Sequence, residues 1–304
     1  IYLSFQTLSD AMQKVFEMID KLADTDANIL VLGENGTGKD IMAKTIYQQS
    51  PRSNDIFISI DLGSISESLF EAELFGYEKG AFTDAKKSKP GRMEVASGGT
   101  LFLDEIGNLS LPMQAKILTA IEKKSITRLG STKDIAIDVR FISATNANIY
   151  QAVANGTFRQ DLLYRINTIE LHIPPLRERG NDIVLLAEYF LSKYAHKYKK
   201  DIQRLSMEVK RKLLSYNWPG NVRELQNIVE RAVVLSSGKA LKADDFILTT
   251  NAVQKMNQEE NFNLEKLEKE TIEKALIVSN GNLNKAAEML GISRYALYRK
   301  LDKQ

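Results

Sequence analysis

A glycine-rich loop between a predicted strand and a predicted helix constrains the possible folds more than any other stretch. Residues 28–32 form a short apolar run, and apolar residues recur at helical spacing from Ile41 to Ile46. Between them lie Gly33, Glu34, Asn35, Gly36, Thr37, Gly38, Lys39 and Asp40. In this context backbone N–H groups converge on phosphate oxygens and Lys39 reaches the outer phosphates. The sequence therefore predicts an α/β P-loop fold rather than a glycine-rich turn with a solvated lysine.

A second predicted strand supplies the carboxylates that such a phosphate loop needs. Asp40 stands where many P-loops have a magnesium-binding Ser or Thr, so the metal must depend on another residue. Residues 98–103 form an apolar, glycine-led run that ends in Asp104 and Glu105. We expect Asp104 to position Mg²⁺ and Glu105 to orient and polarise the attacking water. Two solvated acids at a strand end are the alternative, and the neighbouring phosphate loop argues against it.

Three further residues lie where they could contact a bound nucleotide. Asn146 follows a third predicted strand at 138–144, and it is either a sensor of the terminal phosphate or a turn residue. Arg159 and Arg165 lie six residues apart in a short helical stretch. They are either surface charges or arginines that a P-loop ATPase receives from a neighbouring subunit.

The pattern becomes helical after a proline-containing turn at residues 173–179, where we place the end of the α/β core. Helical periodicity then continues through residues 182–238. In the middle of this region Asn221 is the predicted N-cap of a helix, with Glu224 as its capping-box partner. Arg223 therefore lies in a first helical turn, where it either reaches back to a nucleotide phosphate or pairs with a nearby acid.

The chain closes with a compact helical unit after a polar stretch at 249–263 that predicts a linker. Helical patterns at 264–278, 283–290 and 294–301, with a tight turn at Gly291, match helix-turn-helix architecture. We expect DNA phosphates and base edges to be contacted by Arg294, Tyr295, Arg299 and Lys300. A three-helix module for protein contacts is the alternative.

Composition limits the remaining function classes. The chain has 304 residues, 43% of them hydrophobic and 26% charged, which is enough for two or three globular domains. The absence of cysteine excludes disulfides, thiolate zinc sites and cysteine nucleophiles, and two histidines argue against Ser-His-Asp chemistry. The absence of cysteine also fits a cytoplasmic protein, which is what we expect. No apolar run reaches membrane-spanning length. Because the sequence does not begin with methionine, we expect a further domain before Ile1.

One loop narrows the interpretation to a single family. Residues 73–85 read ELFGYEKGAFTDA, in which Gly76 and Gly80 interrupt a helical pattern before Phe82. Taken alone, Phe82 is more simply a packing anchor than a contact residue. Together with the motifs above, the loop resembles the ELFGxExGAFTGA signature of the sigma-54-dependent transcription activators (NtrC-type bacterial enhancer-binding proteins). The likeness covers almost the whole chain, and an acid after the phosphate-loop lysine is usual in that family.

The resemblance implies an AAA+ P-loop ATPase, with a parallel sheet flanked by helices, an all-α lid and a C-terminal Fis-type helix-turn-helix. We expect the α/β subdomain at 1–175, the lid at 176–245, a linker at 246–262 and the DNA-binding domain at 263–304. The resemblance also assigns site residues: Lys39 in Walker A, Asp104 and Glu105 in Walker B, Asn146 as sensor I, Arg159 and Arg165 as arginine fingers, and Arg223 as sensor II.

The same resemblance implies cofactors and partners. ATP with Mg²⁺ would be hydrolysed between the subunits of a ring, a hexamer when active and a dimer when inactive. Phe82 and Thr83 would contact the sigma-54 RNA polymerase holoenzyme according to the nucleotide state, while the last helix holds double-stranded enhancer DNA. A regulatory domain before Ile1 would make the chain the C-terminal part of a two-component response regulator.

Two residues depart from the family pattern. Asp84 stands where the family has glycine, so it adds a negative charge and is expected to lack freedom at positive φ. Asp61 stands where the family has an asparagine that hydrogen-bonds the Walker B glutamate, and an ionised Asp61 near Glu105 would form a like-charge pair. We therefore expect a tempered sigma-54 contact. A DNA-binding repressor that keeps the ATPase fold is the alternative function.

Overall fold

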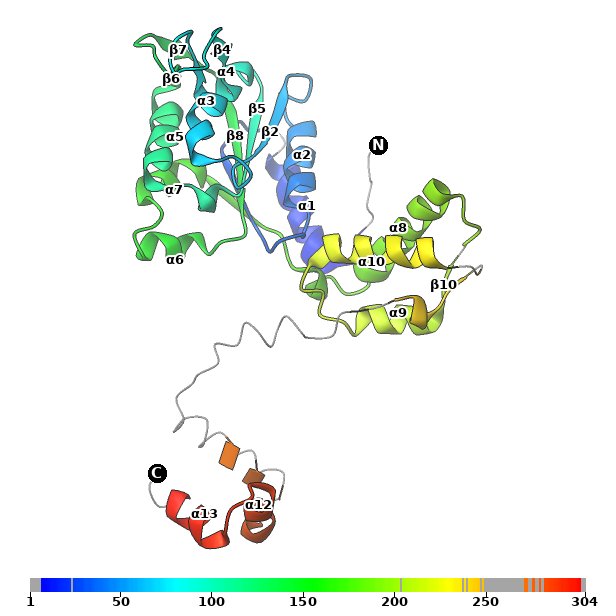
Figure 1. The fold of residues 1–304 in the computed structure, drawn as a ribbon. Helices are drawn as coiled ribbons and strands as arrows, with labels where there is room; N and C mark the ends of the chain where they lie inside the picture. Colours follow the sequence, from blue (N-terminus) through cyan, green and yellow to red (C-terminus); the bar gives the residue numbers. More distant parts are fainter. Residues whose placement is uncertain are drawn as a thin grey trace. The chain divides into compact units, whose positions relative to one another are not determined.

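The computed structural model describes residues 7–22, 24–202, 204–236, 238, 240–246, 248, 271–272, 275–276, 279 and 282–301. The chain divides into two units, Ile1–Leu248 and Thr249–Gln304, which are described separately below (Figure 1). Most of the predicted linker, and much of the helix predicted at 264–278, lie outside the described residues. Among the described helices, none has the length and apolar content needed to span a bilayer.

A parallel sheet with the strand order β2-β5-β8-β1-β9 forms the centre of the first unit. Its strands are β1 (Ile29–Leu32), β2 (Phe57–Asp61), β5 (Thr100–Asp104), β8 (Arg140–Thr145) and β9 (Ile169–His172). The three inner strands are buried along most of their length because both faces of the sheet are covered. β1 lies between β8 and β9, so the loop that follows it leaves the carboxyl edge next to the ends of these two strands, and the end of β5 lies one strand further along the same edge.

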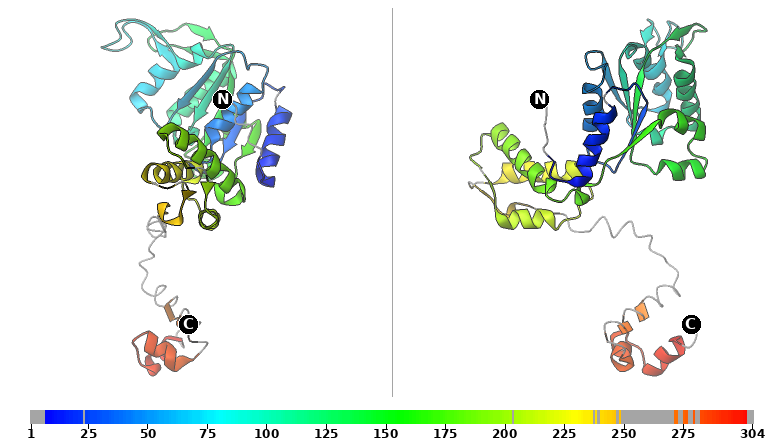
Figure 2. Two further views of the ribbon diagram at one scale, coloured as in Figure 1. Left: turned by 90° about the vertical axis from the view of Figure 1, so that its right-hand side faces the viewer. Right: turned by 180° about the vertical axis from the view of Figure 1, so that it is seen from behind.

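Helices cover both faces of the sheet (Figure 2). One face is covered by α1 (Asp10–Leu22) and α2 (Lys39–Gln48), which pack on Ile29 and Val31. The other face, with Leu30 and Leu32, is covered by α3 (Glu67–Phe75), α4 (Arg92–Val95), α5 (Leu111–Lys123), α6 (Ile149–Ala154) and α7 (Gln160–Ile166). The alternation along β1 thus divides its side chains between two apolar cores. This arrangement confirms the predicted α/β P-loop fold.

Two antiparallel ribbons project from this core. One pairs β3 (Gly76–Tyr77) with β4 (Lys89–Pro90), and the other pairs β6 (Ser125–Thr127) with β7 (Asp134–Ala136). Leu129 joins them, since its carbonyl accepts a hydrogen bond from the Glu78 N–H and its own N–H donates to the Gly76 carbonyl, both at 2.9 Å. The family-signature loop is therefore supported by the β6–β7 ribbon.

The lid is helical and belongs to the same unit. It contains α8 (Asp182–Tyr198), α9 (Met207–Leu214) and α10 (Asn221–Leu235), the 3₁₀ turns η2 (Leu176–Glu178) and η3 (Ala243–Asp245), and the paired strands β10 (Arg204–Leu205) and β11 (Ala240–Leu241). The prediction that Asn221 is an N-cap is wrong. Gly220 occupies the cap and its N–H donates to the Glu224 carboxylate at 2.8 Å, whereas the Asn221 side chain is buried in other contacts.

Trp218 is the anchor of the lid core. Its side chain is fully buried, its ring lies edge-on to Tyr216 at 5.0 Å, and its indole N–H donates to the Leu213 carbonyl at 2.9 Å. Trp218→Ala is expected to destabilise the protein by about 3–5 kcal/mol, because it leaves a cavity and an unsatisfied carbonyl. Thermal or urea unfolding measures this change. The exposed lid residue Met207 supplies the control, and an equal loss in Met207→Ala would contradict the central role of Trp218.

The second unit contains α12 (Leu283–Met289) and α13 (Arg294–Leu301). Asn282 caps α12 with its side-chain oxygen, and Ser293 accepts the Ala296 N–H at the start of α13. The two helices bury a small core of Ile272, Ala275, Ala286, Ala287 and Leu297. The predicted turn is present, with Gly291 at a φ of 64°.

Candidate nucleotide site and regulatory loop

The phosphate loop connects β1 to α2 at the carboxyl edge of the sheet. Gly36 and Gly38 have positive φ angles of 77° and 96°, which glycine adopts without strain. Among the described residues, no acceptor takes a hydrogen bond from the backbone N–H groups of Gly36, Gly38, Lys39 or Asp40. Several unpaired donors at the start of a helix suit a chain of phosphate groups.

Lys39 lies between this loop and the end of β5. Its side chain is 6% exposed, and its ammonium donates to the Gly33 carbonyl at 3.0 Å. The same nitrogen lies 3.7 Å from Oε1 of Glu105. The structure thus brings together two residues separated by 66 positions in the sequence, and it does so at the predicted catalytic edge.

Asp104 and Glu105 end β5 in an environment that disfavours two negative charges. Burial, and after it the charge of Glu105, raises the pKa of Asp104. One oxygen of Asp104 accepts the Glu105 N–H at 3.0 Å. Glu105 has a left-handed backbone, with φ of 55°, and such conformations are costly for a residue with a Cβ. A bound cation would relieve the crowding of carboxylates at this point.

Asn146 donates a hydrogen bond to Glu105, whereas Asp61 accepts one from Gly63. The backbone N–H of Asn146 donates to Oε2 of Glu105 at 3.4 Å, and the Asn146 side chain is exposed. Asp61 is the β2 partner of Asp104, but its carboxylate accepts the N–H of Gly63 at 3.0 Å. Both residues border Gly63, where an added Cβ would lie 3.3 Å from Oδ1 of Asp61 and 3.8 Å from Cβ of Glu105. The charge of Asp61 acts on Asp104, where it adds to the upward pKa shift caused first by burial and then by Glu105.

Arg159 and Arg165 are exposed and pair with acids of their own chain. Arg159 forms two hydrogen bonds with Asp161, at 3.0 and 2.6 Å, and Nε of Arg165 lies 3.1 Å from Glu122. The arginine side chains are 41% and 58% exposed, and neither contacts the phosphate loop of its own subunit. Solvent-exposed pairs contribute little stability, so both arginines can exchange their acids for a stronger anion.

Arg223 lies beside the phosphate loop. Its backbone N–H and that of Val222 donate to the Gly36 carbonyl, at 3.3 and 2.9 Å. The Arg223 side chain is exposed and makes no hydrogen bond or ion pair within the described residues. Its position is compatible with the predicted contact to a phosphate, which stays a prediction.

Sequence reasoning missed a group of lid residues that contact the loop. Arg177 donates two hydrogen bonds to Glu34, Asn221 donates to Glu34 and to the Asn35 carbonyl, and Arg179 donates to the Thr37 carbonyl at 2.8 Å. The only sequence signal for this group was the pair Arg177 and Arg179 after the two prolines of the turn at residues 173–179. No local pattern indicates which distant residues they meet.

The signature loop is a tight turn with Phe82 at its surface. Hydrogen bonds of 2.9 and 3.0 Å link the Gly80 N–H to the Ala85 carbonyl and the Ala85 N–H to the Phe82 carbonyl. Phe82 is 43% exposed and its ring lies 4.9 Å from that of Tyr77, so it both packs and faces solvent. Thr83 and Asp84 are exposed. The expected backbone penalty at Asp84 is wrong, because its φ is not positive; the added charge remains.

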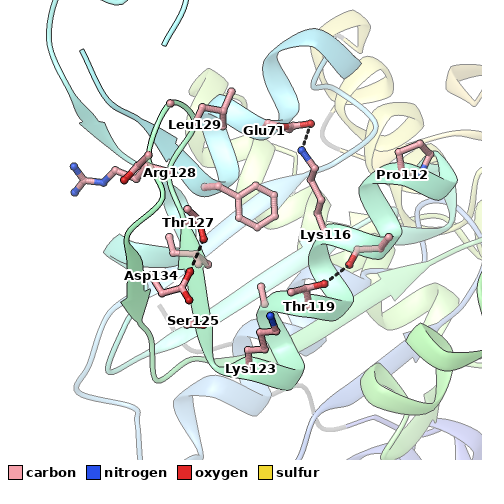
Figure 3. A pocket seen from close by; sticks show the side chains of 16 residues that line it. Glu71, Pro112, Lys116, Thr119, Lys123, Ser125, Thr127, Arg128, Leu129 and Asp134 are labelled. Atoms are coloured by element: carbon pink, nitrogen blue, oxygen red, sulfur yellow. Dashed lines mark hydrogen bonds and ion pairs between the residues drawn. The ribbon is translucent and has the colours of Figure 1, made fainter. Parts of the chain in front are cut away.

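A cavity of about 640 Å³ lies beside this region and not at the phosphate loop (Figure 3). It is bounded by α3, α5 and the β6–β7 ribbon. Figure 3 shows Lys116 paired with Glu71 on one side and Thr127 hydrogen-bonded to Asp134 on the other. None of the predicted nucleotide residues lines it, so its size does not identify the catalytic centre.

The exposed surface of α13 carries the predicted DNA contacts. Arg294, Tyr295 and Arg299 are exposed, with Tyr295 at 83%, and Lys300 is half-buried. The Arg294 guanidinium lies 5.7 Å from the ring of Tyr298. Cationic and aromatic groups on one short helix are suited to phosphates and base edges.

The donor set fits ATP and one magnesium ion. Unpaired N–H groups and Lys39 would hold the phosphates, and Asp104 would hold the metal. The described residues contain no group of three metal-ligating side chains. Magnesium does not require one, because it is commonly bound through one or two carboxylates, substrate phosphates and water.

Comparison with known proteins agrees with this geometry. A family model described as the sigma-54 interaction domain matches residues 5–172, an AAA+ ATPase lid domain matches 177–262, and a bacterial regulatory protein model of the Fis family matches 263–303. The transcriptional regulatory protein ZraR of Salmonella typhi is 42% identical over 297 residues, covering 97% of this chain and 67% of ZraR.

Two further proteins extend the comparison. The nitrogen fixation protein AnfA of Azotobacter vinelandii is 40% identical over 299 residues; these cover 97% of this chain but only 56% of AnfA. The crystal structure of NtrX from Brucella abortus in complex with ATP is 32% identical with a TM-score of 0.74, covering 99% of this chain and 69% of that one. The chain therefore belongs to the NtrC-type family of sigma-54-dependent transcription activators.

Proposed function

We propose that the protein hydrolyses ATP and uses the free energy to remodel sigma-54 RNA polymerase into an open promoter complex. One observation carries the proposal: Lys39 and Asn146 both approach Glu105, at 3.7 and 3.4 Å, beside a loop of unpaired N–H donors. These are the parts that phosphoryl transfer to water requires. The ATP complex of NtrX, a related protein, supports the choice of nucleotide.

Each residue has a separate task in this proposal. The loop N–H groups and Lys39 bind and orient the phosphates, while Glu105 orients the attacking water and accepts its proton. Asp104 would hold Mg²⁺, which when bound neutralises charge on the phosphate oxygens. Lys39 approaches Oε1 of Glu105, and the Asn146 N–H donates to Oε2. The exposed side-chain amide of Asn146 is available to the terminal phosphate.

The arginine fingers require a second copy of the chain. Arg159 and Arg165 are exposed and do not contact their own phosphate loop, so they are available to a neighbour's nucleotide. We propose a ring, a hexamer when active, that assembles from an inactive dimer. ATPase activity per subunit should then rise steeply with protein concentration, in step with the mass measured by light scattering. Activity independent of concentration and mass would contradict the shared site.

Phe82 and Thr83 would form the contact with sigma-54, and α13 would hold enhancer DNA through Arg294, Tyr295, Arg299 and Lys300. A DNA-binding repressor that keeps the ATPase fold is the rival function, and the exposed charge of Asp84 motivates it. Binding to purified sigma-54 in the presence of an ATP transition-state analogue separates the two. Intact ATPase activity without a complex at micromolar protein would favour the repressor.

Phe82→Ala is expected to weaken sigma-54 binding by roughly 30-fold or more, because exposed aromatic side chains dominate small interfaces. ATP hydrolysis should remain near the wild-type rate, since Phe82 contacts Tyr77 and not the phosphate loop. The control is Lys87→Ala, which changes another exposed residue of the loop between β3 and β4. Undiminished binding by Phe82→Ala would remove this ring from the interface.

Asp84→Gly is expected to strengthen sigma-54 binding or leave it unchanged. The substitution removes an exposed charge next to Thr83, and the backbone at this position imposes no strain that glycine would relieve. Asp84→Asn, which removes the charge but keeps a side chain, should act in the same direction. Clear weakening by both variants would show that the carboxylate itself makes a favourable contact.

A further inference from the structure

The carboxylate of Glu34 belongs to the phosphate loop but is bound by the lid. Arg177 donates to its two oxygens at 2.9 and 2.6 Å, and Nδ2 of Asn221 donates to one of them at 3.1 Å. Hydrogen bonding from Arg177 is the main cause of the lowered pKa of Glu34. A bidentate arginine–carboxylate pair fixes the orientation of the two side chains as well as the distance between them. Glu34 therefore ties the loop to the start of the lid.

Asn221 joins three separate segments. Its side chain is fully buried, and its oxygen accepts the Leu176 N–H at 2.7 Å while its amide donates to Glu34 and to the Asn35 carbonyl at 3.0 Å. It is also the first residue of α10, with φ of 51°. One side chain thus holds the lid junction, the phosphate loop and the lid helix together.

The backbone of the phosphate loop also touches the backbone at the start of α10. Two N–H groups of α10, from Val222 and Arg223, share the Gly36 carbonyl. A Cβ on Gly36 would lie 2.5 Å from the Gly220 carbonyl oxygen, so the two segments touch without side chains between them. Arg179 adds a buried link from the junction to the Thr37 carbonyl at 2.8 Å.

We propose that Glu34, Arg177 and Asn221 form a latch that transmits changes of the phosphate loop to helix α10. In this role Glu34 is a positioning residue, because its carboxylate is engaged by the lid and acts on the nucleotide only through the loop. A shift of the loop on binding phosphate must either carry α10 with it or break these bonds. The inference rests on the proposed binding of ATP at this loop.

A double-mutant cycle on the 304-residue chain tests the latch. Glu34→Gln and Arg177→Gln are each expected to weaken binding of a non-hydrolysable ATP analogue by roughly fivefold or more, a typical size for coupling between sites. The double variant should bind no worse than the weaker single variant, since both remove one interaction. Additive losses would overturn the latch. Arg177→Lys, which keeps the charge without the paired geometry, should fall between wild type and Arg177→Gln.

Hydrogen exchange supplies a readout that simple destabilisation would not move. In the wild-type chain the analogue should change the protection of the amides of Val222 and Arg223, and this change should be smaller in Glu34→Gln, where only their bonds to the Gly36 carbonyl remain. Glu178→Gln removes a neighbouring exposed carboxylate and should behave as wild type. A change in protection as large in Glu34→Gln as in the wild type would overturn the latch while leaving ATP binding in place. Failure of the wild-type chain to bind the analogue would overturn the proposed function as well.

Discussion

Glu105→Ala is expected to lower ATP hydrolysis by roughly 10²–10⁴-fold, the usual contribution of a positioned general base. ATP binding should persist, because the unpaired N–H groups of the loop and Lys39 are unchanged. The left-handed backbone at this position strains alanine about as much as glutamate, so the substitution leaves the local fold in place. Steady-state phosphate release and equilibrium binding of a fluorescent ATP analogue measure the two properties separately.

The control for this variant is Glu208→Gln, which changes an exposed carboxylate on the lid helix α9. It should retain hydrolysis. Glu105→Gln keeps the shape and the hydrogen-bond acceptor but is a poor base, and it should resemble Glu105→Ala. Normal turnover by either Glu105 variant would remove this residue from the mechanism and leave Asp104 as the nearest carboxylate to the nucleotide.

Arg165→Ala is expected to reduce hydrolysis by roughly 10³–10⁵-fold in the assembled protein, the effect of losing an arginine finger. Arg159→Ala should have a similar or smaller effect. Because neither arginine contacts its own phosphate loop, binding of ATP to the isolated subunit should remain normal. Phosphate release at saturating protein, with assembly followed by light scattering, measures the loss. Arg211→Ala on α9, an exposed arginine of the lid, is the control.

Mixing two inactive variants tests whether the fingers act between subunits. A Glu105→Ala subunit keeps its arginines, and an Arg165→Ala subunit keeps its Walker B carboxylates. Some interfaces in a mixed ring would contain both intact halves, so the mixture should recover part of the activity. A mixture no more active than its components, despite normal assembly, would show that Arg165 acts within its own chain.

The sequence predicts those parts of the site that depend on residues close together in the chain. The glycines around Lys39 and the acids after β5 each follow a strand, and parallel strands bring their carboxyl ends to one edge. The approach of Lys39 to Glu105 follows from that rule. The helical lid and the turn at Gly291 were likewise predicted, because periodicity and turn chemistry act over a few residues.

The contacts that the sequence does not predict depend on distant segments. Glu34 and Arg177 are separated by 143 positions, and nothing near either residue indicates the other. Asn221 has the residue type of an N-cap, yet burial between the loop and the junction gives its amide stronger partners than its own helix offers. The backbone at Asp84 could not be inferred from a family glycine either, because glycine is compatible with ordinary φ angles as well as positive ones.

The buried guanidinium of Arg179 has a practical consequence for building chimeras. It joins the Thr37 carbonyl to the Pro174 carbonyl, and burial lowers its pKa to about 10. A transplant that exchanged only the helices of the lid would separate this arginine, or Asn221, from the backbone groups that satisfy them. The smallest portable module is therefore the phosphate loop together with residues 174–224. Recombination between relatives should succeed when both segments come from the same parent.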